Sequence, residues 1–124
     1  MTRKKFIEEY TRFIKLAEKL AFKVHEQGTS WLDSVTEDID DELFKEGLRL
    51  VVDEVEPRFI DEIMSNRIAH EKDKNMRLFK IIQKRAVWGI QAGDNVRVLM
   101  SVLNSLAGLS QKEEWKIKEL LLEN

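Results

Sequence analysis

Apolar residues recur every three to four positions along the first part of the chain, which is the spacing of one buried face of an α-helix. This stripe predicts a helix that begins near Phe6 and ends at Gly28, the residue type expected just past a helix end. The opposite face carries mostly basic side chains and is expected to be solvated. The apolar positions are Phe6, Ile7, Tyr10, Phe13, Ile14, Ala17, Leu20, Ala21 and Val24.

Two shorter helical segments are expected next. Thr29 or Ser30 can cap a short second helix, in which Trp31 is an apolar position. The acidic cluster within residues 37–42 then acts as a break and as the start of a third helix, because carboxylates stabilise the positive end of a helix. The third segment has its apolar positions at Leu43, Phe44, Leu48, Val51, Val52 and Val55.

Pro57 marks the start of a fourth helix, because its missing N–H costs nothing in the first helical turn. Residues 70–75 are wholly polar, so either one helix crosses an exposed middle or a break lies near residues 73–75. We expect one continuous helix over residues 58–88, because no Gly or Pro interrupts it. Its first buried stripe is predicted to be Phe59, Ile60, Ile63, Met64 and Ile68.

Glycines and capping residues divide the C-terminal third of the chain. Ser110 and Glu113 have the spacing of a capping box and predict a last helix. No segment favours a strand, so we predict an all-α fold in one domain over residues 1–124, a compact bundle of five to six helices with no sheet. Before that last helix, Gly89 and Gly93 mark a junction, Asp94 or Asn95 can start the next helix, and Gly108 ends that helix.

The charge balance narrows the class of function. The chain has 21 Lys and Arg against 23 Asp and Glu, so 35% charged residues leave a net charge of only −2. A nucleic-acid-binding domain usually has a basic excess, so we expect no nucleic-acid partner. The longest apolar run, residues 98–109, is shorter than the roughly 20 residues that cross a bilayer. Without a signal-peptide core and without Cys, the chain is expected to be soluble and cytoplasmic, with no membrane insertion.

No residue pattern indicates catalysis or metal binding. The two histidines, His25 and His70, lie in different segments, and neither has a second ligand at helical spacing. The carboxylates of residues 37–42 lack the glycine-containing spacing of a calcium loop. There is no recognisable pair of nucleophile and base. We therefore predict a protein that is not an enzyme, with no catalytic residue, metal or cofactor.

Two features are candidates for binding. Arg77, Lys80 and Lys84 share one side of a helix, which suits phosphates or an acidic partner, although a charged series is more often just a solvated face. Tryptophan is enriched in protein interfaces. Of the three in this chain, we expect Trp88 to be the most buried and Trp115 the least, with two of the three in the core.

Residues 47–64, GLRLVVDEVEPRFIDEIM, carry the most specific pattern in the chain. They resemble the cytoplasmic region of MotA-type flagellar stator subunits, of the MotA/TolQ/ExbB proton channel family, whose pattern is G-L-x-L-V-V-D-G-x-x-P-x-x-I-x-x-I-L. Glu54 stands where that family often has Gly. Aligned on Gly28 and Pro57, residues from about 13 to 109 look like that region running into its third membrane span.

The resemblance implies a docking function. In that family, a stretch with a basic residue at its start and an acid at its end contacts the rotor through its charged side chains. Here His25 replaces the base and Asp33 supplies the acid. The candidate partner-binding residues are therefore His25, Asp33, Glu37, Asp38, Arg77, Lys80 and Lys84, and the implied partner is a flagellar rotor or stator protein.

Two functional hypotheses follow. Because the membrane spans of a stator are lacking, the chain looks like a soluble derivative of the stator cytoplasmic domain, or like a convergent helical module with a similar local pattern. The first hypothesis is a non-enzymatic protein–protein interaction module. The alternative is an enzymatic or small-molecule-binding helical bundle with a pocket at Trp88. The sequence leaves the oligomeric state open and is compatible with a homo-oligomer.

Overall fold

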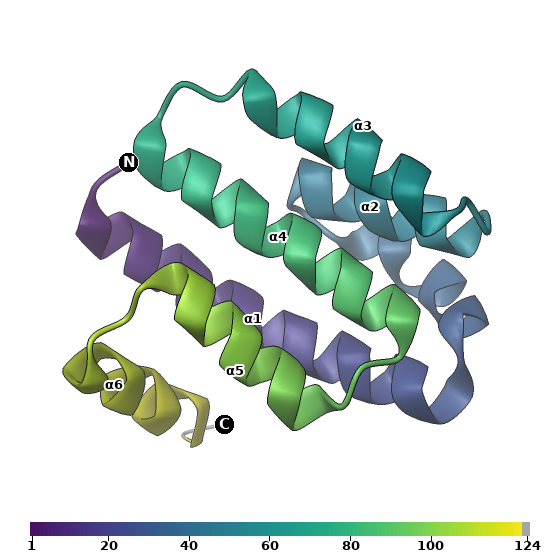
Figure 1. The fold of residues 1–124 in the computed structure, drawn as a ribbon. Helices are drawn as coiled ribbons and strands as arrows, with labels where there is room; N and C mark the ends of the chain where they lie inside the picture. Colours follow the sequence, from purple (N-terminus) through teal and green to yellow (C-terminus); the bar gives the residue numbers. More distant parts are fainter. Residues whose placement is uncertain (123–124) are drawn as a thin grey trace.

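The computed structural model describes residues 1–122, which form six α-helices and two short 3₁₀ helices without any strand (Figure 1). The predicted all-α class is confirmed, although the expected short second helix is a pair of 3₁₀ helices. None of the helices in this part of the chain is both long and apolar enough to cross a membrane. The elements are α1 (Arg3–Gln27), η1 (Thr29–Ser34), η2 (Thr36–Asp38), α2 (Glu42–Val52), α3 (Pro57–Ala69), α4 (Lys74–Ala92), α5 (Val96–Ala107) and α6 (Gln111–Leu122).

Helix α4 is the centre of the bundle. It packs against α1, α2, α3 and α5. Figure 1 shows α3, α4 and α5 in a front layer with α1 and α2 behind them, and α6 beside α1. A helix with neighbours on several sides needs a wide apolar face and small residues where backbones approach. In α4 both conditions are met, because Ala86 and Gly89 are buried together with larger side chains.

The core is built around Phe13 of α1. Its ring meets the ring of Phe44 from α2 edge-on at 4.8 Å, and the ring of Phe79 from α4 edge-on at 5.5 Å. All three side chains are almost fully buried. Edge-to-face aromatic pairs add stability beyond the area that they bury, so this cluster joins three helices at one point. The stripe predicted for α1 is confirmed, apart from a half-buried Ile7.

The junction between α2 and α3 is a helix end of the Schellman type, closed by two backbone hydrogen bonds. The N–H of Glu54 donates to the Val51 carbonyl oxygen at 3.0 Å, and the N–H of Val55 donates to that of Leu50 at 3.0 Å. Glu54 has a φ of +59°, the only positive φ of a non-glycine residue among residues 1–122. Pro57 then occupies the first turn of α3, as its sequence position predicts.

The prediction of one continuous helix over residues 58–88 is wrong, because α3 ends at Ala69 and α4 begins at Lys74. The break is stabilised by side chains of the polar stretch itself. Asp73 caps α4 by accepting a hydrogen bond from the N–H of Met76 at 2.8 Å, and its carboxylate also pairs with the amino group of Met1 at 2.6 Å. The second contact is long-range, so local helical spacing could not reveal it.

The predicted stripe of α3 was partly wrong. Ile60, Met64 and Ile68 are buried, but Ile63 is half-buried and Phe59 is exposed. The buried residues recur every four positions. Helix α3 therefore contacts the bundle along a single narrow line, and the neighbouring apolar side chains fall outside it.

The last two helices begin as predicted, and α5 also ends as predicted, at Gly108. Asn95 caps α5 by accepting from the N–H of Val98 at 3.1 Å, and Ser110 and Glu113 exchange the two hydrogen bonds of a capping box. Gly93, rather than Gly89, is the residue past the end of α4. Gly89 lies inside the helix, where the methyl groups of Leu99 occupy the space that a side chain would need.

Candidate functional site

The chain reverses direction after α1, and this reversal exposes the acidic candidates. Gly28, with a φ of +82°, turns the chain into η1. Leu32 is fully buried, and the Thr36 hydroxyl donates to the Leu32 carbonyl oxygen at 2.6 Å, which fixes one side of the two 3₁₀ helices in the core. Their other side, which carries Asp33, therefore faces solvent.

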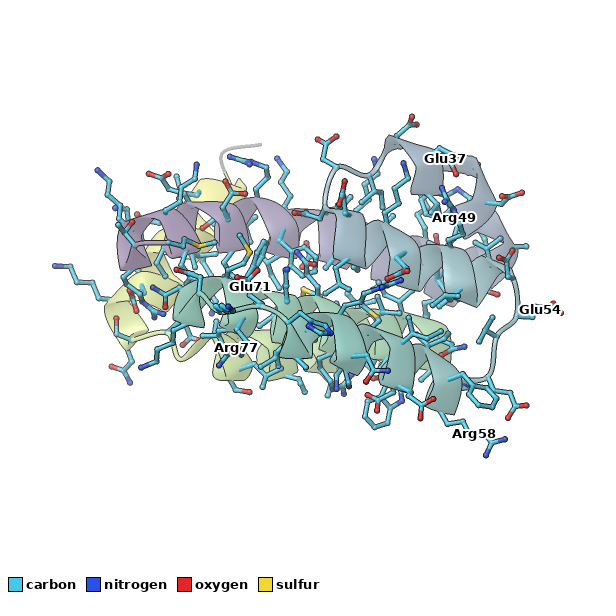
Figure 2. All side chains as sticks on the ribbon, turned by 90° about the horizontal axis from the view of Figure 1, so that it is seen from above. Glu37, Arg49, Glu54, Arg58, Glu71 and Arg77 are labelled. Carbon is cyan, nitrogen blue, oxygen red and sulfur yellow. The ribbon has the colours of Figure 1, made fainter. Side chains whose placement is uncertain are left out.

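The candidates His25, Asp33 and Asp38 are exposed where α1 leads into η1 and η2. Within residues 1–122 none of the three has an ion-pair partner. Glu37 differs, because it pairs with Arg49 of α2 and lies 3.6 Å from the Lys45 ammonium (Figure 2). Glu37 thus ties η2 to α2, whereas the Asp33 and Asp38 carboxylates and the His25 imidazole are exposed at this end and available to a partner.

The basic candidates of α4 lie apart from the acidic ones and already have partners. Lys80 pairs with Glu71 at 2.8 Å, and Lys84 pairs with Asp61 at 2.9 Å and donates to the Ser65 hydroxyl at 3.0 Å. Arg77 Nε donates to the Glu71 carbonyl oxygen at 2.9 Å, and Figure 2 shows this pair well away from Glu37. The hydrogen bond from Lys80 lowers the pKa of the Glu71 carboxyl. These cations hold α4 to α3 and to the turn between them.

The prediction that Trp88 is the most buried tryptophan is wrong, because its side chain is 58% exposed and that of Trp115 is 66% exposed. Trp31 is half-buried, so none of the three lies in the core. Trp88 lies on the outer side of α4, where the Arg85 guanidinium covers its ring at 5.3 Å. The hollow beside it is about 140 Å³, smaller than the roughly 300–1,000 Å³ of typical ligand pockets, and does not favour the ligand-binding alternative.

A larger groove runs between α1 and the segment that carries η1 and η2, with a volume of about 420 Å³. It is lined by apolar side chains, Phe13, Leu16 and Trp31 among them, and by charged side chains that include Asp38. The sequence prediction missed this groove. The signal was present, since Leu16, which lines the groove, is an apolar residue of α1 that falls outside its buried stripe.

Comparison of the chain with protein-family models, with curated proteins and with solved structures found no match. Within residues 1–122, no group of three or more His, Cys, Asp or Glu side chains is placed to hold a metal ion. The one deeply buried phenol, Tyr10, donates to the Asn104 side-chain oxygen at 2.6 Å, and burial raises its pKa far above the ordinary value. Its role is therefore structural, and the surface features above carry the functional argument.

Proposed function

We propose that this chain is a non-enzymatic protein-interaction module related to the cytoplasmic region of MotA-type stator subunits, and that it docks on a rotor or stator component of a flagellar motor. The observation that carries this proposal is the backbone at Glu54. The family pattern has Gly at that position, and here Glu54 has the left-handed conformation that Gly adopts most easily. If the likeness were due to chance, there would be no reason for the Gly of the family pattern to align with Glu54. Among residues 1–122, Glu54 is the one non-glycine residue with a left-handed backbone.

Two further positions of the pattern have structural roles that fit it. Gly47 lies where a side chain would come within 2.8 Å of both Met64 Sδ and Val87 Cγ2, so α2 can approach α3 and α4 only without one. Pro57 starts α3. Gly47, Met64 and Pro57 belong to the same 18-residue pattern, and the pattern therefore describes one packed helix–turn–helix unit.

The docking surface that we propose is the end of the molecule formed by His25, Asp33 and Asp38. The three are exposed and lack ion-pair partners in the described part of the chain. Asp33 is anchored by buried Leu32 beside it, so its carboxylate is held on a fixed backbone. Exposed carboxylates such as Asp33 and Asp38 contribute mainly to the rate and specificity of association, which suits a partner surface that also carries charge.

The test is co-purification of flagellar motor proteins with the tagged chain from a motile cell that contains it. Asp33→Lys is the test variant, and Glu62→Lys, an exposed carboxylate on α3 without an ion pair in residues 1–122, is the matched control. We expect the wild type and Glu62→Lys to recover a rotor or stator protein and Asp33→Lys to recover at least tenfold less. Both variants are expected to melt within a few degrees of the wild type, as typical surface changes do.

Salt provides a second readout of the same contact. Raising the ionic strength from about 0.05 to 0.5 M shortens the screening distance to a few ångströms, so the wild-type complex should weaken. Failure to recover any motor protein contradicts the proposed function. Equal recovery by the wild type and Asp33→Lys contradicts only the choice of docking surface, not the docking function.

A further inference from the structure

The outward face of α1 has a ridge with a hollow on each side. Arg12, Leu16 and Lys19, spaced three and four residues apart, form the ridge and line both hollows. One hollow, of about 420 Å³, lies toward η1 and η2, and the other, of about 700 Å³, lies toward the start of α5. A helix ridge flanked by grooves is the shape that packs against another helix of the same kind.

This face also exposes apolar side chains that the fold does not need to expose. Phe22 is 52% exposed and lines the hollow toward α5. Trp31 and Leu16 are half-buried and line the hollow on the other side of the ridge. Aromatic side chains of this kind supply much of the binding energy in protein interfaces, so the face is suited to burial against a protein surface.

The charges on the two edges of the face are opposite in sign. Lys15 and Lys19 are exposed on α1 and have no ion-pair partner among residues 1–122. Across the groove, Asp38, Asp40 and Asp41 also lack one. Burial, with a smaller contribution from Glu9 and Asp40, raises the pKa of the Asp41 carboxyl, and the Arg12 guanidinium only partly opposes this. Although Arg12 lies near the acidic edge and Glu18 near the two lysines, neither set of charges forms an ion pair within residues 1–122.

We propose that this face is the contact between two copies of the chain, related by a two-fold axis that sets α1 of one copy against the groove of the other. A two-fold contact is self-complementary, so that when one residue meets a second, the second meets the first. The α1 ridge of each copy then enters the hollow of the other. The same rotation places the lysines of each copy beside the aspartates of its partner, which is the charge arrangement that favours association.

A second copy explains these features better than a single helix from another protein. One helix can fill one hollow, but it leaves the ridge and the other hollow uncovered. It must also carry acids along one edge and bases along the other in the right order, whereas a second copy provides both. The two proposals share Asp38 but are tested separately, because Asp33, the test position for docking, does not line this face.

The experiment measures the mass of the full chain by sedimentation velocity and light scattering over about 1–500 µM. Two double charge reversals are compared with the wild type, Lys15→Glu with Lys19→Glu, and Asp38→Lys with Asp40→Lys. We expect the wild type to form dimers, and each double variant to raise the dissociation constant at least tenfold. An equimolar mixture of the two variants should restore dimers, because the charges at positions 15, 19, 38 and 40 of the mixed pair again set lysines against carboxylates.

Controls separate this contact from other effects. Lys72→Glu with Lys74→Glu makes the same change in net charge on two exposed lysines elsewhere, and should dimerise as the wild type does. Leu16→Glu should abolish dimers while the helical circular dichroism spectrum is retained. A wild type that is monomeric at 500 µM overturns the proposal. Dimers that persist in both double variants, or a mixture that stays monomeric, overturn it as well.

Discussion

Replacement of Glu54 by Gly tests the backbone argument at the α2–α3 junction. Glu54 is exposed, and Figure 2 shows its side chain pointing away from the molecule, so packing does not enter the comparison. Its φ of +59° costs an L-residue about 1–2 kcal/mol, because Cβ approaches a backbone oxygen. Gly removes that cost, but its greater conformational freedom stabilises the unfolded state by about 0.4–1 kcal/mol. The net expectation is a stabilisation of about 0.5–1 kcal/mol.

The assay is urea unfolding of wild type, Glu54→Gly, Glu54→Asn and Glu54→Ala, with thermal melting as a second readout. Asn tolerates the left-handed region better than other side chains, so it should fall between Gly and the wild type. Ala removes the charge but keeps Cβ, so it should give no gain. Equal stabilisation by Ala and Gly would show that charge, not backbone conformation, is responsible. Destabilisation by Gly would refute the reasoning about this turn, and with it the main support for the family relationship.

Three other predictions concern stability. Gly47→Ala should destabilise by about 1 kcal/mol, because crowding against Val87 outweighs the better helix propensity of Ala; a rise in the urea midpoint would contradict this. Ile60→Ala should lower the free energy of unfolding by about 2–5 kcal/mol, and Ile63→Ala by less than half as much, because Ile60 is buried and Ile63 only half-buried. Equal urea midpoints for the two variants would show that the buried face of α3 is misplaced. Asp41→Asn should raise the melting temperature at pH 7, because burial, followed by nearby carboxylates, raises the Asp41 pKa and so disfavours the folded, ionised form. The gain should vanish as pH falls below the ordinary aspartate pKa, where Asp41 is protonated in both states; a gain that persists there would contradict this cause.

Most of the helix boundaries were predictable because their signals are local. The end of α1 at Gly28, the start of α3 at Pro57 and the capping box before α6 each depend on a few adjacent residues. The break before α4 was not predictable in this way. Asp73 caps the helix locally, but its contact with the amino group of Met1 joins residues 72 positions apart.

The candidate surface was predictable only in part. The exposure of Asp33 was predictable, because a charged residue next to a buried leucine in a short helical turn points to the solvent side. The predicted basic face is not free for a partner, because Lys80 forms an ion pair with Glu71 and Lys84 with Asp61. Only the packing of α3 against α4 brings these carboxylates near. The exposure of Trp88 likewise depends on which sides of α4 its neighbours cover.

The most direct test of the central claim is swimming in a strain from which this gene is deleted. If the chain docks on the motor, deletion should reduce swimming speed or the fraction of swimming cells in soft agar and in tracked single cells. Wild type and Glu62→Lys, expressed at equal levels, should restore motility, and Asp33→Lys should restore it less. Normal swimming of the deletion strain would contradict a motor role for this chain.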